Sequence, residues 1–203
     1  MTVRRPAGLA AAGVLALALT AALTACDRVR ETDDRPGDPK ASATGATVPG
    51  DPMAAQAAAS RCRSDEIGAT VQVKGAGSAL LTVRNKSDHT CTLYGYPGIG
   101  GLRADNTVDV LPGTHEARPA GPVLVTLKPD KSGYAGFRWS ACEKSDATCH
   151  TITGLQVTPP DERAPVIAEV LGADGKPVGE LLVSAAGLTV GTLQPSDEKV
   201  LSD

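Results

Sequence analysis

Short apolar runs separated by polar and turn-forming residues dominate the chain between Cys62 and Leu193. In Thr70–Val73 polar and apolar side chains alternate, which is the pattern of a strand with one buried face. Gly, Pro, Asn or Asp stands between successive runs and predicts turns there. Further clear runs cover residues 79–85, 91–96, 123–127, 133–139, 152–158, 166–171 and 188–193.

About seven to nine short strands, with no convincing amphipathic helix, predict an all-β fold, an antiparallel immunoglobulin-like β-sandwich. One hairpin is expected around Ala104–Asn106, between residues 99–103 and 107–111. Asp174-Gly175 predicts a second hairpin that returns the chain through Val178–Val183. The Pro- and Gly-rich stretch Leu111–Pro122 is expected to be a long loop.

The first 25 residues have the segment order of a secretory signal peptide. Arg4 and Arg5 precede the apolar run Ala7–Leu23, and small residues lead up to Cys26. Leu23-Thr24-Ala25-Cys26 resembles the lipobox of bacterial lipoproteins, which implies lipid attachment to the Cys26 thiol and cleavage before it. A diacylglyceryl group supplies the two acyl chains that a stable anchor needs. An ordinary secreted protein and an uncleaved anchor are the alternatives, and the export route, general secretory or twin-arginine, is open.

Four regions follow from these patterns. Residues 1–25 are the cleaved signal peptide, and residues 26–60 are the lipidated cysteine followed by a disordered linker. Residues 61–194 form the β-sandwich domain, and residues 195–203 are a polar C-terminal tail. The linker has almost no large apolar side chains, so we expect it to be a flexible tether that holds the domain away from the membrane. Its Ala54–Ala59 run favours a helix but is too short to be stable alone.

Charge and aromatic content narrow the function classes. Removal of Arg4 and Arg5 with the signal leaves 18 basic against 23 acidic side chains, a formal net charge of −5. The mature chain therefore lacks the excess of basic side chains that is typical of nucleic-acid-binding proteins and of polybasic membrane-surface proteins. One Trp, one Phe and three Tyr leave the core to aliphatic side chains, so covalent cross-links would help a domain of this size to fold.

Apart from Cys26, the chain has four cysteines, Cys62, Cys91, Cys142 and Cys149. In an exported chain they predict two disulfides, for which three connectivities exist. We favour Cys62–Cys91 and Cys142–Cys149, because each pair is close in sequence and flanks strand-like segments. A metal site of Cys142, Cys149 and His150 is the alternative, but it lacks the paired spacing of structural zinc sites.

Several segments together resemble the domain of unknown function 4232 family, which is carried by exported proteins and lipoproteins. The most specific of them is Cys91–Gly98, and the others are Ala76-Gly77, Leu81–Asn85, Val125–Pro129, Tyr134–Trp139 and the Cys142/Cys149 pair. The resemblance covers roughly Cys62 to Leu193. It implies a β-sandwich and no activity, because the family is defined by having none assigned. Leu127-Lys128-Pro129-Asp130 departs from the usual Leu-x-Pro-Gly turn, although Pro-Asp also suits a type I turn.

No catalytic constellation is evident. His89, His115 and His150 lie in polar or turn-like contexts and are expected to be exposed loop residues. Asp161 and Glu162 follow two prolines and are expected at a solvated loop tip rather than in a glycosidase pair. The candidate serine nucleophiles lack nucleophile-elbow glycines, and they are Ser60, Ser78, Ser87 and Ser140. The region of Asp105 and Asp109 lacks the spacing of a calcium loop, so we expect no cofactor and no metal.

Tyr94, Tyr96 and Pro97 are the most informative cluster. Aromatic rings at a strand end would present a surface to a peptide or glycan. Alternation along a strand instead places both rings on one face, where they would pack on the core near Trp139. We favour the structural interpretation, with the Gly and Pro setting a corner.

These observations predict a non-catalytic binding or interaction module, lipid-anchored through Cys26 on the outer face of a bacterial cell membrane. The expected contacts are membrane lipid, through the anchor, and an envelope protein or cell-wall glycan; nucleic acid is not expected. The oligomeric state is open. An enzyme acting on cell-wall material and a purely structural surface lipoprotein are the alternatives.

Overall fold

The computed structural model describes residues 51–75 and 77–202. The predictions for residues 1–25, for Cys26 and for residues 27–50 therefore lie outside the described residues. The regular secondary structure of the described part consists of β-strands apart from one short α-helix and one 3₁₀ turn, so the all-β prediction is confirmed. The helices are α1 (Pro52–Ala59) and η1 (Ser64–Glu66). The strands are β1 (Ile67–Gly75), β2 (Ser78–Asn85), β3 (Cys91–Leu93), β4 (Gly98–Leu102), β5 (Val108–Asp109), β6 (Gly113–His115), β7 (Val125–Leu127), β8 (Ser132–Trp139), β9 (His150–Ile152), β10 (Gly154–Thr158), β11 (Val166–Leu171), β12 (Leu181–Val183) and β13 (Leu188–Val190).

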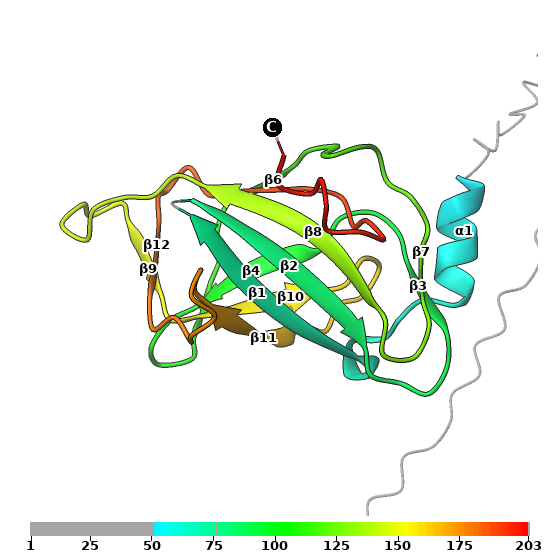
Figure 1. Cartoon of the computed structure of the whole chain (residues 1–203). Helices are drawn as coiled ribbons and strands as arrows, with labels where there is room; N and C mark the ends of the chain where they lie inside the picture. Colours follow the sequence, from blue (N-terminus) through cyan, green and yellow to red (C-terminus); the bar gives the residue numbers. More distant parts are fainter. Residues whose placement is uncertain (1–50, 76, 203) are drawn as a thin grey trace, which may run out of the picture. The chain divides into compact units, whose positions relative to one another are not determined.

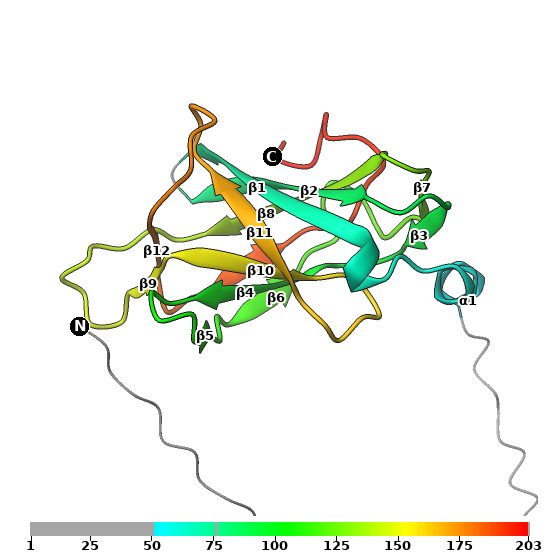
Figure 2. The ribbon, with the colours of Figure 1, turned by 90° about the horizontal axis from the view of Figure 1, so that it is seen from below.

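Nine of the described strands form one curled sheet in the order β5-β4-β10-β11-β1-β2-β8-β13-β6 (Figure 1). Its neighbours are antiparallel except for β1 with β11 and β13 with β6, which run parallel and were not anticipated. Because the sheet curls, β1 and β2 lie on one side of the domain, and β4, β10 and β6 lie on the opposite side (Figure 2). Tyr96, just before β4, stacks on His115 of β6 with ring centroids 4.5 Å apart, so the curl brings the two ends of the sheet together.

Aliphatic side chains fill the inside of the curled sheet, as the scarcity of aromatics predicts. In β1, Ile67, Ala69 and Val71 point inward, and in β2 Leu81 and Val83 do the same. Alternation in a strand sends every second side chain to the same face, which creates this inner layer. Full burial of a Val, Leu or Ile side chain stabilises a fold by roughly 1.5–3 kcal/mol.

Two small two-stranded sheets lie at opposite ends of the domain (Figures 1 and 2). β3 pairs with β7 at the end that carries α1, and β9 pairs with β12 at the other. The second sheet corrects one prediction. The Asp174-Gly175 turn returns the chain on β11 as predicted, with Leu171 bridged to Pro177 and Val178 N bonded to Val170 O (3.0 Å), but the return is short, and β12 beyond it pairs with β9.

Two further strand predictions need correction. The predicted loop Leu111–Pro122 contains β6, which pairs with β13 at the edge of the sheet. The predicted single strand over residues 152–158 is divided at Thr153, whose backbone N–H donates to Leu102 O (2.8 Å). This break lets β9 leave the large sheet while β10 stays in it.

The predicted disordered linker, residues 26–60, does not extend to residue 60. α1 begins after Asp51, whose side chain accepts a hydrogen bond from Met53 N (2.9 Å) as an N-cap. Ala57 is buried, and its carbonyl accepts a bond from Thr92 Oγ1 of β3 (3.2 Å). Packing against β3 supplies the stability that an isolated helix of this length lacks.

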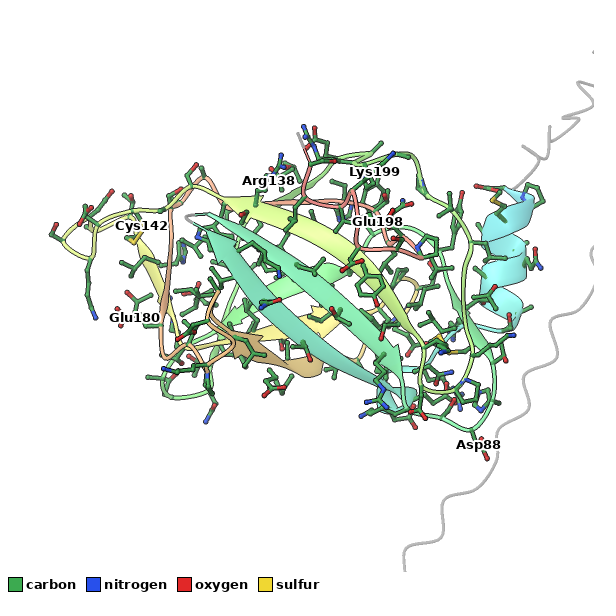
Figure 3. The ribbon with its side chains drawn as sticks, in the orientation of Figure 1. Asp88, Arg138, Cys142, Glu180, Glu198 and Lys199 are labelled. Atoms are coloured by element: carbon green, nitrogen blue, oxygen red, sulfur yellow. A yellow bond between two sulfur atoms is a disulfide. The ribbon has the colours of Figure 1, made fainter. Side chains whose placement is uncertain are left out.

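The predicted polar tail also packs on the domain over its described residues. Val200 is buried, and a Cβ added to Gly136 of β8 would lie 2.1 Å from Val200 O, so only glycine permits this approach. Arg138 Nη2 donates to Leu201 O (2.6 Å) and Arg118 Nη1 to Ser202 O (3.3 Å). Figure 3 shows Arg138 close to this segment, which also carries Glu198 and Lys199.

Candidate functional site

The β4–β5 hairpin positions the first two residues of the candidate site, Arg103 and Asp109. Its turn is where the sequence predicts it, with Asn106 at φ 63° and Arg103 N bonded to Thr107 O (2.9 Å). Asp105 Oδ1 accepts from Thr107 N (3.0 Å) and from Thr107 Oγ1 (2.6 Å). These two bonds lower the pKa of the Asp105 carboxyl and fix the turn.

Asp109 is the centre of the site. Its side chain is only 6% exposed, and it accepts from Arg103 Nε at Oδ2 (3.0 Å) and pairs with His150 Nδ1 at Oδ1 (3.0 Å). Burial by itself would raise the pKa of this carboxyl. The hydrogen bonds from Arg103 and His150, with their positive charges, outweigh burial and hold the pKa of Asp109 below its usual range.

This contact assigns the proton on the His150 ring. An ionised carboxylate only accepts hydrogen bonds, so Nδ1 of His150 carries the proton that it donates to Asp109. Nε2 is then a bare acceptor while the ring is neutral and a donor once the ring is protonated. The expectation that His150 is an exposed loop residue is wrong: it begins β9, and its side chain is 25% exposed.

Arg103, Asp109 and His150 line a pocket of about 660 Å³ at the β9–β12 end of the domain. At its rim, Lys144 Nζ lies 3.0 Å from Oε1 and 2.7 Å from Oε2 of Glu180. Figure 3 shows Cys142 and Glu180 at this end. The remaining lining residues are small or hydroxyl-bearing: Ala104, Ala147, Thr148, Cys149, Thr151, Thr153 and Ala185.

The disulfide Cys142–Cys149 closes the loop that forms one wall of this pocket. Asp146 Oδ1 accepts from Thr148 N (2.9 Å) and Thr148 Oγ1 (2.8 Å), and these bonds lower the pKa of Asp146. The pairing is the one expected from sequence. It uses both thiols that the alternative metal site required, and among residues 51–75 and 77–202 no group of three His, Cys, Asp or Glu side chains is placed to hold a metal ion.

The second expected disulfide, Cys62–Cys91, lies in the core at the other end, next to α1 and β3. Two disulfides are typical of proteins that fold outside the reducing cytoplasm. No helix within the described ranges is long and apolar enough to cross a bilayer.

The Tyr94–Pro97 corner makes structural contacts with two elements, α1 through Tyr94 and β6 through Tyr96. Tyr94 OH hydrogen-bonds Asp51, the N-cap of α1; this bond lowers the pKa of Asp51 and raises that of Tyr94. Tyr96 stacks on His115, which is exposed in β6. Both rings are half-buried, Pro97 is buried, and neither tyrosine belongs to the core cluster that Trp139 joins. The corner therefore ties α1 and β6 to the sheet.

The other predicted candidates lie apart from the pocket. His89 is exposed, with Nε2 3.4 Å from Glu66 Oε1. Glu162 is not at a solvated tip: it is 16% exposed and accepts from Arg61 Nε (2.7 Å), while Asp161 holds the turn before it at φ 62°. None of the candidate serines lines the pocket, and they are Ser60, Ser78, Ser87 and Ser140.

The site unites residues that the sequence does not mark as a group. Arg103 and Asp109 are six positions apart across a hairpin, whereas His150 comes from a strand 41 positions further on. Local alternation points the wrong way: in Val108-Asp109-Val110 it predicts inward valines, whereas the structure exposes both valines and buries Asp109. An acid at an inward position predicts a buried polar contact, but not which partner it has.

The fold and its two cross-links define a disulfide-bonded all-β domain. The chain belongs to the family described as Domain of unknown function (DUF4232), whose profile matches residues 62–194, and the resemblance seen in the sequence is thereby confirmed. No curated protein and no solved structure is detectably similar to the chain.

Proposed function

We propose that this protein is a lipid-anchored extracytoplasmic binding module whose ligand occupies the pocket lined by Arg103, Asp109 and His150. Three features support the proposal. The Leu23–Cys26 lipobox supplies an anchor, the two disulfides fit an oxidising compartment, and the pocket presents polar side chains held in place by the fold.

The observation that carries the proposal is the position of Asp109. A buried carboxylate is costly unless it is paired, and this one is used to fix two side chains at the edge of a pocket. Fixing a side chain before a ligand arrives reduces the entropy lost on binding. A purely structural domain would gain as much stability from an apolar residue at the same inward position.

An enzyme acting on cell-wall material is the second candidate, because an Asp–His pair also orients the general base of many hydrolases. Such a mechanism needs a nucleophile within hydrogen-bond reach of the free imidazole nitrogen. In the described part of the chain no hydrogen bond joins His150 to a hydroxyl or thiol group. This favours binding over nucleophilic catalysis.

The anchor is tested by Cys26→Ser in cells fed a clickable fatty acid. Loss of label from the protein, with an unprocessed or mislocalised precursor, is the expected result, because serine has no thiol to receive the diacylglyceryl group. Cys142→Ser and Cys149→Ser together form the control and should keep the label. Unchanged labelling of the Cys26 variant would refute the anchor.

The binding site is tested by chemical cross-linking on intact cells, comparing Arg103→Gln with Arg84→Gln. The two arginines match in their own exposure, 59% and 58%, and each contacts one aspartate, at 3.0 Å and 2.8 Å, but the partner Asp109 is buried whereas Asp130 is exposed, so folding of both variants is checked first. Arg103→Gln should weaken capture of envelope material by about ten- to a hundredfold, since a charge-assisted hydrogen bond contributes about 1.5–3 kcal/mol. Equal capture by the two variants would place binding elsewhere.

A further inference from the structure

The carboxylates of the pocket are already occupied by protein donors. Asp109 uses Oδ2 for Arg103 and Oδ1 for His150. Both oxygens of Glu180 lie within 3.0 Å of Lys144 Nζ. The pocket therefore offers little to a cation or to a ligand rich in hydrogen-bond donors.

Its donors, by contrast, are incompletely used. Arg103 contacts Asp109 only through Nε, and among the described residues no hydrogen bond engages its two terminal guanidinium nitrogens at the pocket edge. The same carboxylate holds Nδ1 of His150, and within residues 51–75 and 77–202 Nε2 has no hydrogen-bond partner. A guanidinium with two free terminal nitrogens matches the geometry of a carboxylate or phosphate group.

We propose that the pocket binds an oxyanion, a carboxylate or phosphodiester group of an envelope polymer, and that it binds more tightly when His150 is protonated. This inference rests on the binding function proposed above. Protonation changes Nε2 from an acceptor, which repels an anionic oxygen, to a charged donor.

The charged groups around the pocket that His150 lines set the direction of this pH dependence. From the β4–β5 hairpin, Asp109 and Arg103 carry opposite charges. Glu180, before β12, and Lys144, in the disulfide-closed loop, also carry opposite charges. With both pairs balanced, protonation of His150 gives the site a net positive charge.

The test uses the full chain purified with its anchor in detergent micelles, with ¹⁵N-labelled histidine side chains. Only three histidines are present, so single variants assign their signals. N-acetylmuramic acid supplies a carboxylate, dimethyl phosphate supplies a phosphodiester, and N-acetylglucosamine is the neutral control. Both anions keep one negative charge between about pH 5.5 and about pH 7.5, one unit on either side of the ordinary histidine pKa of about 6.5.

At least one anion should shift the His150 signal, with higher affinity at the acid end, because protonation turns Nε2 into a charged donor. The anion that binds identifies the source of the group. His150→Gln should abolish the pH dependence, Arg103→Gln should weaken binding at both pH values, and His89→Gln should leave both properties unchanged. Absence of binding by both anions, equal binding of the neutral sugar, or pH dependence that survives in His150→Gln would overturn the inference.

The two proposals fail separately. If both anions fail but capture on cells still depends on Arg103, the ligand class is wrong and the binding function stands. If the anions bind but Arg103→Gln does not reduce capture on cells, the oxyanion site stands and the proposed function fails.

Discussion

The two ends of the domain carry the same covalent feature in different surroundings. At the α1 end, Cys62 and Cys91 are buried, and they cross-link residues 29 positions apart. At the pocket end, Cys142 and Cys149 are half-exposed and only seven positions apart. The first disulfide belongs to the core cluster, whereas the second closes a surface loop.

This difference separates the part of the molecule that stabilises the fold from the part that forms a site. Around Cys62–Cys91 the neighbours are aliphatic side chains and the docked helix α1. Around Cys142–Cys149 they are a guanidinium, a carboxylate, an imidazole and several hydroxyls. We infer that the α1 end has mainly a structural role, and we propose that the β9–β12 end carries the binding chemistry.

The largest expected effect is that of removing the buried disulfide. Cys62→Ala with Cys91→Ala should lower the free energy of unfolding by about 3.5 kcal/mol from loop entropy alone, and the lost core packing adds to this. Urea unfolding measures the change. A loss smaller than that of the surface disulfide would contradict the comparison.

Removing the surface disulfide should cost less and act on the site. Cys142→Ala with Cys149→Ala should lower the free energy of unfolding by about 2.5 kcal/mol, since the closed loop is shorter. The His150 signal should shift while the His89 signal stays in place. If both histidines kept their signals, the loop would not shape the pocket.

An intermediate effect is expected at Asp109. Its pKa in the folded protein is depressed, so its stabilisation is complete above the unfolded value of about 3.9 and is lost as pH falls through the lower, folded value. Asp109→Asn should cost roughly 1–3 kcal/mol near neutral pH. It should also flatten the decline of stability in that acidic window, as followed by urea unfolding at a series of pH values. An unchanged decline would show that Asp109 is not the group responsible.

The smallest effect is expected at the tyrosine corner. Tyr94→Phe removes only the hydroxyl that bonds the N-cap Asp51, so α1 should open more often while the sheet is unaffected. Amide hydrogen exchange should become faster in residues 52–59 and stay constant in β8. Faster exchange throughout the domain would show that the corner supports the whole fold.

The sequence was informative where structure depends on local chemistry. Alternating runs identified most strands, and Asp105 with Asn106 located the hairpin that carries Arg103 and Asp109. β6 and β12 were missed or mispaired because their partners are chosen by the curl of the sheet. α1 was underestimated because its stability comes from packing on β3, a contact between segments distant in sequence.

The candidate site could not be predicted from local sequence patterns, because it also depends on contacts between segments that are distant in sequence. Nothing near His150 in the sequence shows that Asp109 lies beside it, because the pairing depends on β9 leaving the large sheet. The two disulfides were easier to anticipate, since four cysteines in an exported chain leave only three connectivities.

The most direct test of the division between the two ends is photo-cross-linking in intact cells. A photoreactive amino acid is placed at Ala104, exposed beside the pocket, or at Lys128, exposed after β7 at the opposite end. We expect envelope material to be captured from Ala104, to be lost when Arg103→Gln is added, and not to be captured from Lys128. Capture from Lys128 alone, or from both positions regardless of Arg103, would contradict the account.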